Sequence, residues 1–276
     1  MAKYAVGRDE VLGALEETLK PLDYVQAMWE AGAIAFGRVD EWSDIDLQVA
    51  SDDDRVEDVF VAVERALAEL SDIDLKYRLP EPTWHGHSQV FYRLAAASPF
   101  LMLDFVVLKA SAEDKFMQPE IHGRPRVYFD KTGVVRPDPF DAEAFAGRLR
   151  DRVSEMRVLY QMFEILTRKE LNRGNDIEAV GFYHGYTLRP LLQALRIRYD
   201  PTRHNFHTRY VHYDLPDDVV ERLRRLFFVA DADELVAKRD EAEKWFAEVM
   251  NEISDGPFTE DILRAAARSA GGEDHA

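Results

Sequence analysis

Two aspartates separated by one residue stand in the segment 44–49, which reads DIDLQV. On an extended strand, side chains two residues apart leave by the same face, so Asp44 and Asp46 would lie together while the apolar residues enter a core. Two neighbouring carboxylates repel unless a cation lies between them, and oxygen ligands of this kind suit Mg²⁺. The segment therefore predicts a strand with a magnesium-binding pair, although a half-buried strand with two solvated acids has the same pattern.

A third carboxylate interrupts the apolar segment 100–108, which reads FLMLDFVVL. Such a run predicts a buried strand. A buried carboxylate without a partner is costly, so Asp104 needs a metal ion, a cationic side chain or a proton. A metal site shared with Asp44 and Asp46 and a salt bridge to an arginine are the two interpretations.

A turn of small residues precedes the first acidic strand. Its glycines, Gly32 and Gly37, would allow the backbone to approach a phosphate and to present N–H groups to it. Together with the segment 43–47, which reads SDIDL, this turn resembles the nucleotidyltransferases of the DNA polymerase beta superfamily. Their signature is a Gly-Ser turn followed by Asp-x-Asp on a strand, and here Gly32 lies 44 − 32 = 12 residues before the first aspartate. Ala33 stands where that family has its serine, and Phe36 where an arginine is frequent.

The resemblance implies a role for each part of the motif. Asp44 and Asp46 would hold a metal ion that bridges the phosphates of a nucleoside triphosphate. Asp104 would be the third catalytic carboxylate, joining them on a second ion beside the attacking hydroxyl. The expected metal ligands are Asp44, Asp46 and Asp104, and the expected nucleotide-binding residues are Gly32, Ala33, Arg38, Ser43, Arg189 and Arg203.

The periodicity predicts an α+β protein with two domains. Residues 1–138 would form a mixed β-sheet with helices on one side, and residues 139–276 a helical bundle, because the apolar period changes from two to about 3.6 after a proline-rich connector. The expected strands are 24–31, 44–49, 73–79, 88–95 and 100–108, with a hairpin over 121–135. The expected helices are 8–19, 56–70, 145–166, 176–198, 217–229, 233–253 and 259–270.

The helical half gives this organisation a resemblance to the antibiotic nucleotidyltransferases of the kanamycin and streptomycin types. In that family the helical domain closes one side of the cleft and supplies charged residues to the substrates. Arg189 precedes a proline in an apolar helix and Arg203 lies in a polar, aromatic loop, so these two are ranked first for such contacts. The segment 84–87, which reads WHGH, has no obvious third metal ligand and is interpreted as a surface loop, with a substrate-contacting lid as the alternative.

Composition limits the partners. A formal charge of −17 on 276 residues argues against broad binding to nucleic acid and suits a small, cationic substrate. The absence of cysteine excludes disulfides and thiolate metal sites. No apolar run is long enough to span a membrane and no signal-peptide pattern is present, so we expect a cytoplasmic protein.

The predicted reaction is transfer of a nucleoside monophosphate, AMP from ATP by resemblance, to a hydroxyl of a small aminoglycoside-like acceptor, with Mg²⁺ as cofactor and pyrophosphate as product. One alternative is a nucleotide-binding or protein-interaction module that kept the fold without catalysis. Another is an antitoxin-like enzyme that modifies a protein or tRNA. The sequence leaves open the acceptor and whether a homodimer completes the cleft.

Overall fold

The computed structural model describes residues 4–255 and 258–271. The chain divides into two compact units. The first, here called the sheet unit, comprises Met1–Pro139 and Ser269–Ala276, and the second, the helical unit, comprises Phe140–Arg268.

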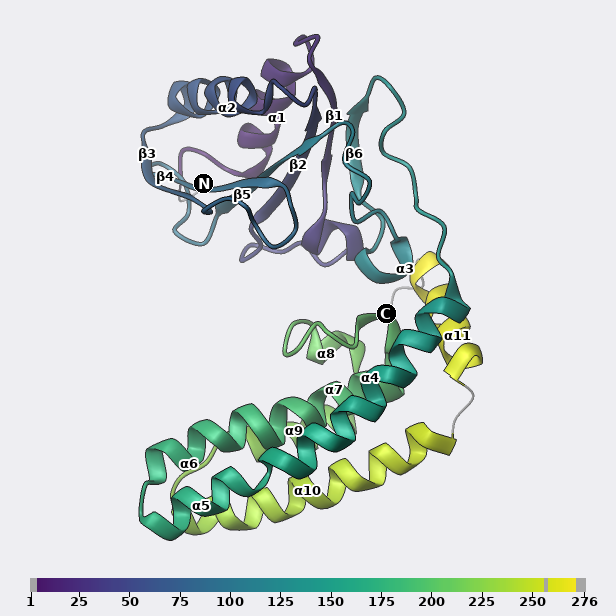
Figure 1. Cartoon of the computed structure of the whole chain (residues 1–276). Coiled ribbons are helices and arrows are strands. Elements are labelled where there is room, and N and C mark those ends of the chain that lie inside the picture. Colours follow the sequence, from purple (N-terminus) through teal and green to yellow (C-terminus); the bar gives the residue numbers. More distant parts are fainter. Residues whose placement is uncertain (1–3, 256–257, 272–276) are drawn as a thin grey trace. The chain divides into compact units, whose positions relative to one another are not determined.

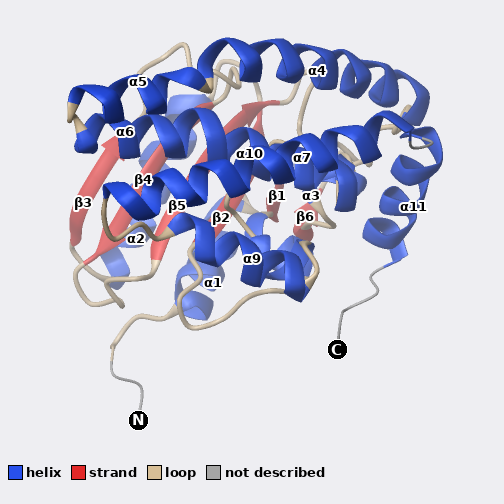
Figure 2. Ribbon diagram, turned by 90° about the horizontal axis from the view of Figure 1, so that it is seen from below, coloured by secondary structure: helices blue, strands red, loops and turns tan. Residues whose placement is uncertain are grey.

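Six strands of the sheet unit form one mixed sheet in the order β3-β4-β5-β2-β1-β6 (Figures 1 and 2). The central strands β2 and β5 are parallel, and the other neighbours are antiparallel. This arrangement confirms the predicted mixed sheet. The strands are β1 Val25–Glu30, β2 Ile45–Ser51, β3 Ile73–Arg78, β4 Ser88–Leu94, β5 Met102–Lys109 and β6 Arg126–Asp130.

Two helices, α1 (Arg8–Leu19) and α2 (Val56–Leu70), cover one face of this sheet, as Figure 1 shows. Their apolar residues recur at helical spacing and pack against the buried side chains of β2 and β5, among them Leu47 and Phe105. Because side chains alternate along a strand, Asp46 and Asp104 point to the opposite face. The helices thus fix the sheet from behind and leave the two carboxylates on the side that they do not cover.

The predicted hairpin over 121–135 is wrong. A short helix, α3 (Pro119–His122), is followed by the single edge strand β6. The carboxylate of Asp130 then accepts backbone N–H groups from Gly133 at 2.7 Å and from Val135 at 3.0 Å. These bonds hold the following residues in a side-chain-capped turn, so they are not available to pair as a returning strand.

The helical unit confirms the predicted α-helical C-terminal half. The helix predicted over 176–198 contains a π-helical segment, η2, directly before Arg189 and Pro190. Proline has no N–H to donate, and the wider turn accommodates this interruption of the helix. The elements are α4 Ala142–Phe163, α5 Ile165–Arg173, α6 Asp176–Phe182, η2 Tyr183–Leu188, α7 Arg189–Tyr199, η3 Pro201–Arg203, α8 Val211–Asp214, α9 Asp217–Phe227, α10 Ala232–Asp255 and α11 Phe258–Gly271.

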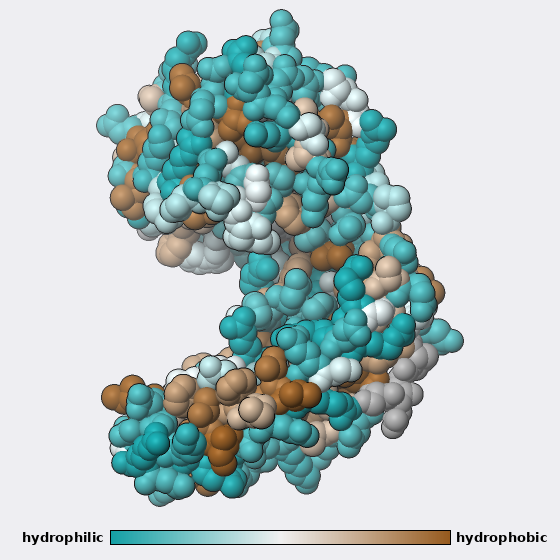
Figure 3. All heavy atoms as spheres, in the orientation of Figure 1, coloured by the Kyte–Doolittle hydropathy of each residue, from teal (hydrophilic) through white to brown (hydrophobic). Residues whose placement is uncertain are grey.

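The surface of the helical unit carries hydrophobic side chains beside the charged ones (Figure 3). The most exposed of them on α4 and α6 are Val158, Met162 and Ile177. Within residues 4–255 and 258–271, every helix is too short or too polar to cross a membrane.

Candidate active site on the central strands

Asp46 and Asp104 lie side by side on the two parallel strands at the centre of the sheet. The register pairs Asp46 of β2 with Asp104 of β5 directly. Neighbouring strands run about 5 Å apart, so both carboxylates leave the same face at one level. The sequence places these aspartates 58 positions apart (104 − 46 = 58), and the parallel pairing makes them neighbours.

Asp44 lies just before β2, and its main chain is held by an arginine from the first helix. Arg8 donates from Nη1 to the carbonyl oxygen of Asp44 at 2.7 Å and forms an ion pair with Glu30, which is fully buried. Glu30 also accepts a hydrogen bond from the hydroxyl of Tyr128 at 2.8 Å. Arg8 therefore links the start of β2 to a buried carboxylate on β1 and fixes the backbone from which Asp44 extends.

The environment of Asp104 combines burial with one strong hydrogen bond. Burial raises the pKa of Asp104, and the negative charge of Asp44 raises it further. The amide of Gln89 on β4 donates to Oδ1 of Asp104 at 2.6 Å, which acts in the opposite direction. Oε1 of Gln89 in turn lies 2.9 Å from Nε2 of His85. The aspartate is thus in the electrostatic field of Asp44 and is held from the neighbouring strand.

The glycine turn touches the carboxylate of the second aspartate. Residues Gly32–Phe36 form a 3₁₀ helix, η1, and Gly32 has the left-handed φ of 63°. A Cβ atom at Gly32 would lie 1.7 Å from Oδ2 of Asp46. The N–H of Ala31 also donates to the carbonyl oxygen of Asp46 at 2.9 Å. Only glycine fits between this turn and β2, and the turn is therefore built around Asp46.

The other predicted residues of the turn have structural contacts of their own. Ala33 is buried, and its carbonyl oxygen accepts the N–H of Arg38 at 2.9 Å. The guanidinium of Arg38 lies 5.3 Å from the ring centre of Phe36. Ser43 exchanges hydrogen bonds with Asp40, whose carboxylate accepts its hydroxyl at 2.9 Å. Ser43 therefore shapes the turn that leads into β2.

In the helical unit, the two predicted arginines have different surroundings. Arg189 is exposed, and its Nη2 lies 3.3 Å from Nε2 of His207. The pKa of His207 is lowered by partial burial and by the neighbouring charges of Arg189 and Arg209. Arg189 and Arg209 are both exposed, so their charges act on His207 from the surface of the helical unit.

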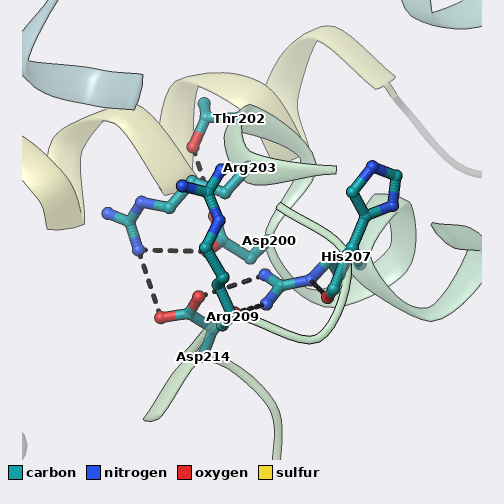
Figure 4. A network of polar contacts seen from close by, with 7 residues as sticks. Asp200, Thr202, Arg203, His207, Arg209 and Asp214 are labelled. Carbon is teal, nitrogen blue, oxygen red and sulfur yellow. Dashed lines mark hydrogen bonds and ion pairs between the residues drawn. The ribbon is translucent and has the colours of Figure 1, made fainter. Parts of the chain in front are cut away.

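Arg203 is buried in a network of ion pairs (Figure 4). Its Nη1 lies 3.1 Å from Oδ2 of Asp200 and 3.4 Å from Oδ1 of Asp214. Arg196, which is fully buried, binds the same Asp214 at 3.1 Å and donates from Nε to the carbonyl oxygen of His207 at 2.7 Å. These contacts make Arg203 part of the internal support of the loop that follows α7.

The donor set on the central strands fits a magnesium ion that arrives with a phosphate ligand. Mg²⁺ prefers oxygen donors and usually takes only one or two carboxylates, completing its shell with water and substrate phosphates. Asp46 and Asp104 supply carboxylate oxygens at one level, and the Gly32 turn leaves room beside Asp46 only for a backbone without Cβ. Among the residues that the structure describes, no three His, Cys, Asp or Glu side chains are grouped so as to hold a metal ion on their own.

Three residues of this region were not predicted from the sequence. Arg8 carries no motif and reaches Asp44 across 36 positions (44 − 8 = 36). Gln89 lies on a strand whose alternation is visible, but its partner Asp104 could be identified only from the order of the strands. The sequence predicts a surface loop around His85, and the structure connects the ring of His85 to the site through Gln89.

Comparison with known proteins gives matches among solved structures. One is an aminoglycoside 6-adenyltransferase from Bacillus subtilis, which is 11% identical, with 96% of this chain and 99% of that chain covered and a TM-score of 0.35. Another is the spectinomycin adenyltransferase AAD(9) from Enterococcus faecialis with ATP and spectinomycin, 8% identical, with 96% of this chain and 100% of that chain covered and a TM-score of 0.37. No family model matches the chain, and no curated protein matches it significantly. By name both structures are adenyltransferases.

Proposed function

We propose that the sheet unit carries the active site of a Mg²⁺-dependent nucleotidyltransferase that moves AMP from ATP to a hydroxyl of a small acceptor. The observation that carries this proposal is the direct pairing of Asp46 with Asp104 on parallel strands, beside a glycine turn that contacts Asp46. A pair of carboxylates next to a backbone turn suits a metal-bound triphosphate, because the acids bind the ion and N–H groups bind phosphate oxygens.

Each residue of the site would have a separate role in the transfer of AMP. Asp44 and Asp46 would hold the ion that accompanies the triphosphate, and the turn at Gly32 and Ala33 would offer backbone N–H groups to phosphate oxygens. Asp104 would hold the second metal position with them, orient the acceptor hydroxyl and receive its proton. A new bond forms between that oxygen and the α-phosphorus, the bond to the bridging oxygen of the β-phosphate breaks, and pyrophosphate leaves. When bound, Mg²⁺ supplies neutralisation of the phosphate charge and lowers the pKa of the attacking hydroxyl.

The acceptor is proposed from charge. The chain carries a formal charge of −17, which attracts cations and repels nucleic acid. An aminoglycoside-like molecule carries positively charged amino groups, which the negative charge of the protein attracts, and several hydroxyls that can accept AMP.

The second candidate is a module that binds nucleotide without transferring it. Ala33 favours it, because the hydroxyl that the related enzymes place at this position is absent. The carboxylates favour the enzyme, because binding alone does not require Asp104 beside Asp46.

Two measurements test the proposal. Titration of the protein with ATP in the presence of Mg²⁺ in a calorimeter should give heat, and heat without transfer would support the binding module. Incubation with ATP labelled at the α-phosphate and a panel of aminoglycosides and spectinomycin should give a labelled product. The Asp46→Asn variant should lose that product, and transfer that persists within a few fold in this variant would rule out the metal-binding role.

A further inference from the structure

We infer that His85 and Gln89 form a positioning relay for Asp104: a chain of two hydrogen bonds that fixes the rotation of its carboxylate. This inference rests on the proposed function for its catalytic consequence, but the relay itself is a feature of the fold. Nε2 of His85 lies 2.9 Å from Oε1 of Gln89, and Nε2 of Gln89 lies 2.6 Å from Oδ1 of Asp104.

The polarity of the chain follows from the chemistry of its members. A carboxylate accepts hydrogen bonds only, so Gln89 must direct its NH₂ group toward Asp104. The amide oxygen of Gln89 then faces His85 and can only accept. Nε2 of His85 must therefore carry a proton, which assigns the tautomer of this ring.

The other nitrogen of the ring agrees with that assignment. Nδ1 of His85 lies 3.2 Å from the backbone N–H of His87, a donor, and can accept from it. The hydroxyl of Thr83 lies 3.3 Å from the same Nδ1 but donates its proton to the carbonyl oxygen of His87 at 2.6 Å. The loop between β3 and β4 thus holds the ring with Nδ1 as acceptor and Nε2 as donor.

The sheet places the relay where it can act on the site. Gln89 of β4 is paired with Val106 of β5, so Asp104, two positions away, is its diagonal neighbour on the same face. The amide occupies Oδ1 of Asp104, and rotation of the carboxylate would break that bond. Oδ2 of Asp104 is therefore fixed in one direction. A carboxylate oxygen that has to approach a substrate hydroxyl needs such a fixed orientation.

The first experiment tests the hydrogen bonds of the relay by NMR and does not require enzymatic activity. Long-range ¹H–¹⁵N spectra of the nucleotide-free protein at alkaline pH distinguish the two neutral tautomers of each histidine. We expect His85 in the Nε2–H form in the wild type. In Gln89→Leu the Nε2–H proton should shift upfield and exchange faster with water, because its hydrogen-bond acceptor is lost. The Nδ1–H form in the wild type, or an unchanged spectrum in the variant, would overturn the relay.

A matched control is available in the same sheet. Gln26 donates to Oδ1 of Asp52 at 2.6 Å, the same pair of groups at the same distance, beyond the other end of β2. Gln26→Leu should therefore leave the Nε2–H signal of His85 unchanged. It removes an equivalent hydrogen bond without touching Asp104.

The second experiment measures the catalytic consequence with MgATP and an acceptor from the panel. We expect Gln89→Leu to lower kcat at least tenfold and to raise the Mg²⁺ concentration for half-maximal rate, with KM for ATP changed less than threefold. His85→Phe should act in the same direction more weakly, and His85→Gln should recover activity because its amide can donate to Gln89. Gln26→Leu should stay within twofold of the wild type.

The outcomes separate this inference from the proposed function. A Gln89→Leu variant that matches Gln26→Leu in kcat and Mg²⁺ dependence contradicts the relay, even if the wild type transfers AMP and Asp46→Asn does not. A wild type without transfer contradicts the proposed function, and the tautomer of His85 then still decides whether the relay exists. Loss of folded protein alone would lower kcat without moving the Mg²⁺ dependence.

Discussion

Gly32 and the carboxylate of Asp46 are in such close contact that a methyl group on the glycine would lie 1.7 Å from Oδ2. The contact joins the two halves of the sequence motif, the turn and the acidic strand, in one piece of structure. It also explains why the turn requires glycine, since the φ of 63° adds a second reason against any larger residue.

The first prediction concerns this contact. Gly32→Ala must displace either the turn or the carboxylate of Asp46, and the left-handed backbone adds about 1–2 kcal/mol of strain. We expect ATP binding in the presence of Mg²⁺ to weaken at least tenfold, measured by calorimetry. Gly13→Ala is the control, because a Cβ at Gly13 on α1 would meet nothing within 4 Å. Equal affinities in the two variants would contradict the role of the turn.

The second prediction restores the missing hydroxyl. Ala33→Ser would add one hydrogen-bond donor at a buried position of the turn. The nucleotidyltransferases that the motif resembles have serine at this position. A hydrogen bond contributes about 1 kcal/mol, so the dissociation constant for MgATP should fall roughly fivefold. Ala35→Ser in the same 3₁₀ helix should leave the constant unchanged. An affinity no better than that of this control would show that Ala33 does not face the phosphates.

The third prediction concerns the support of the loop after α7. Arg196 is fully buried and holds Asp214 together with the carbonyl oxygen of His207, a residue with a φ of 54°. Arg196→Leu leaves the buried carboxylate with fewer partners and should lower the free energy of unfolding by about 3–5 kcal/mol. Arg198 lies on the same helix as Arg196 and forms an exposed ion pair with Glu252 of α10. Arg198→Leu should lower the free energy of unfolding by less than about 1 kcal/mol. Urea unfolding curves of both variants provide the measurement, and similar midpoints would refute the prediction.

The fourth prediction is a pH dependence of stability in the helical unit. Burial and a hydrogen bond shared with Glu164 raise the pKa of Glu243 from its ordinary 4.5 to about 7, against the opposing charge of Arg239. Between these values the folded state binds more protons than the unfolded state, so the stability that Glu243 contributes at low pH is lost as the pH rises from 4.5 through 7.

Glu243→Gln keeps a side chain of the same shape and does not titrate. We expect its free energy of unfolding to depend less on pH over that interval than that of the wild type. Glu241→Gln, which alters an exposed pair with Arg222, is the control. Parallel profiles for Glu243→Gln and the wild type would show that Glu243 is ionised throughout the interval.

The sequence predicts local elements well and distant neighbours poorly. The alternation in 44–49 and the apolar run 100–108 correctly identify β2 and β5. A strand with one buried face has apolar residues at every second position, and a strand with two buried faces has them at nearly every position. The pairing of Asp46 with Asp104 depends on which strands lie side by side, and periodicity does not contain that information. For the same reason the sequence does not point to Arg8 or Gln89, although each contacts one of the predicted aspartates.

Side-chain hydrogen bonds account for the other differences between prediction and structure. The hairpin over 121–135 fails because the carboxylate of Asp130 binds the N–H groups that a second strand would use. The role of Arg203 in nucleotide binding stays a prediction, and the structure adds its ion pairs with Asp200 and Asp214. The sequence shows only a polar, aromatic loop at this position, because the pairing of its charges depends on the fold.

Replacement of Asp104 by asparagine is the most direct test of the central claim, which is that this carboxylate acts with Asp46 on the transfer step. The measurement is release of pyrophosphate from MgATP with an accepted aminoglycoside, together with the calorimetric affinity for MgATP. The account predicts that Asp104→Asn binds MgATP within about threefold of the wild type and loses at least a thousandfold in rate, roughly 4 kcal/mol in the barrier. A rate within tenfold of the wild type would contradict it.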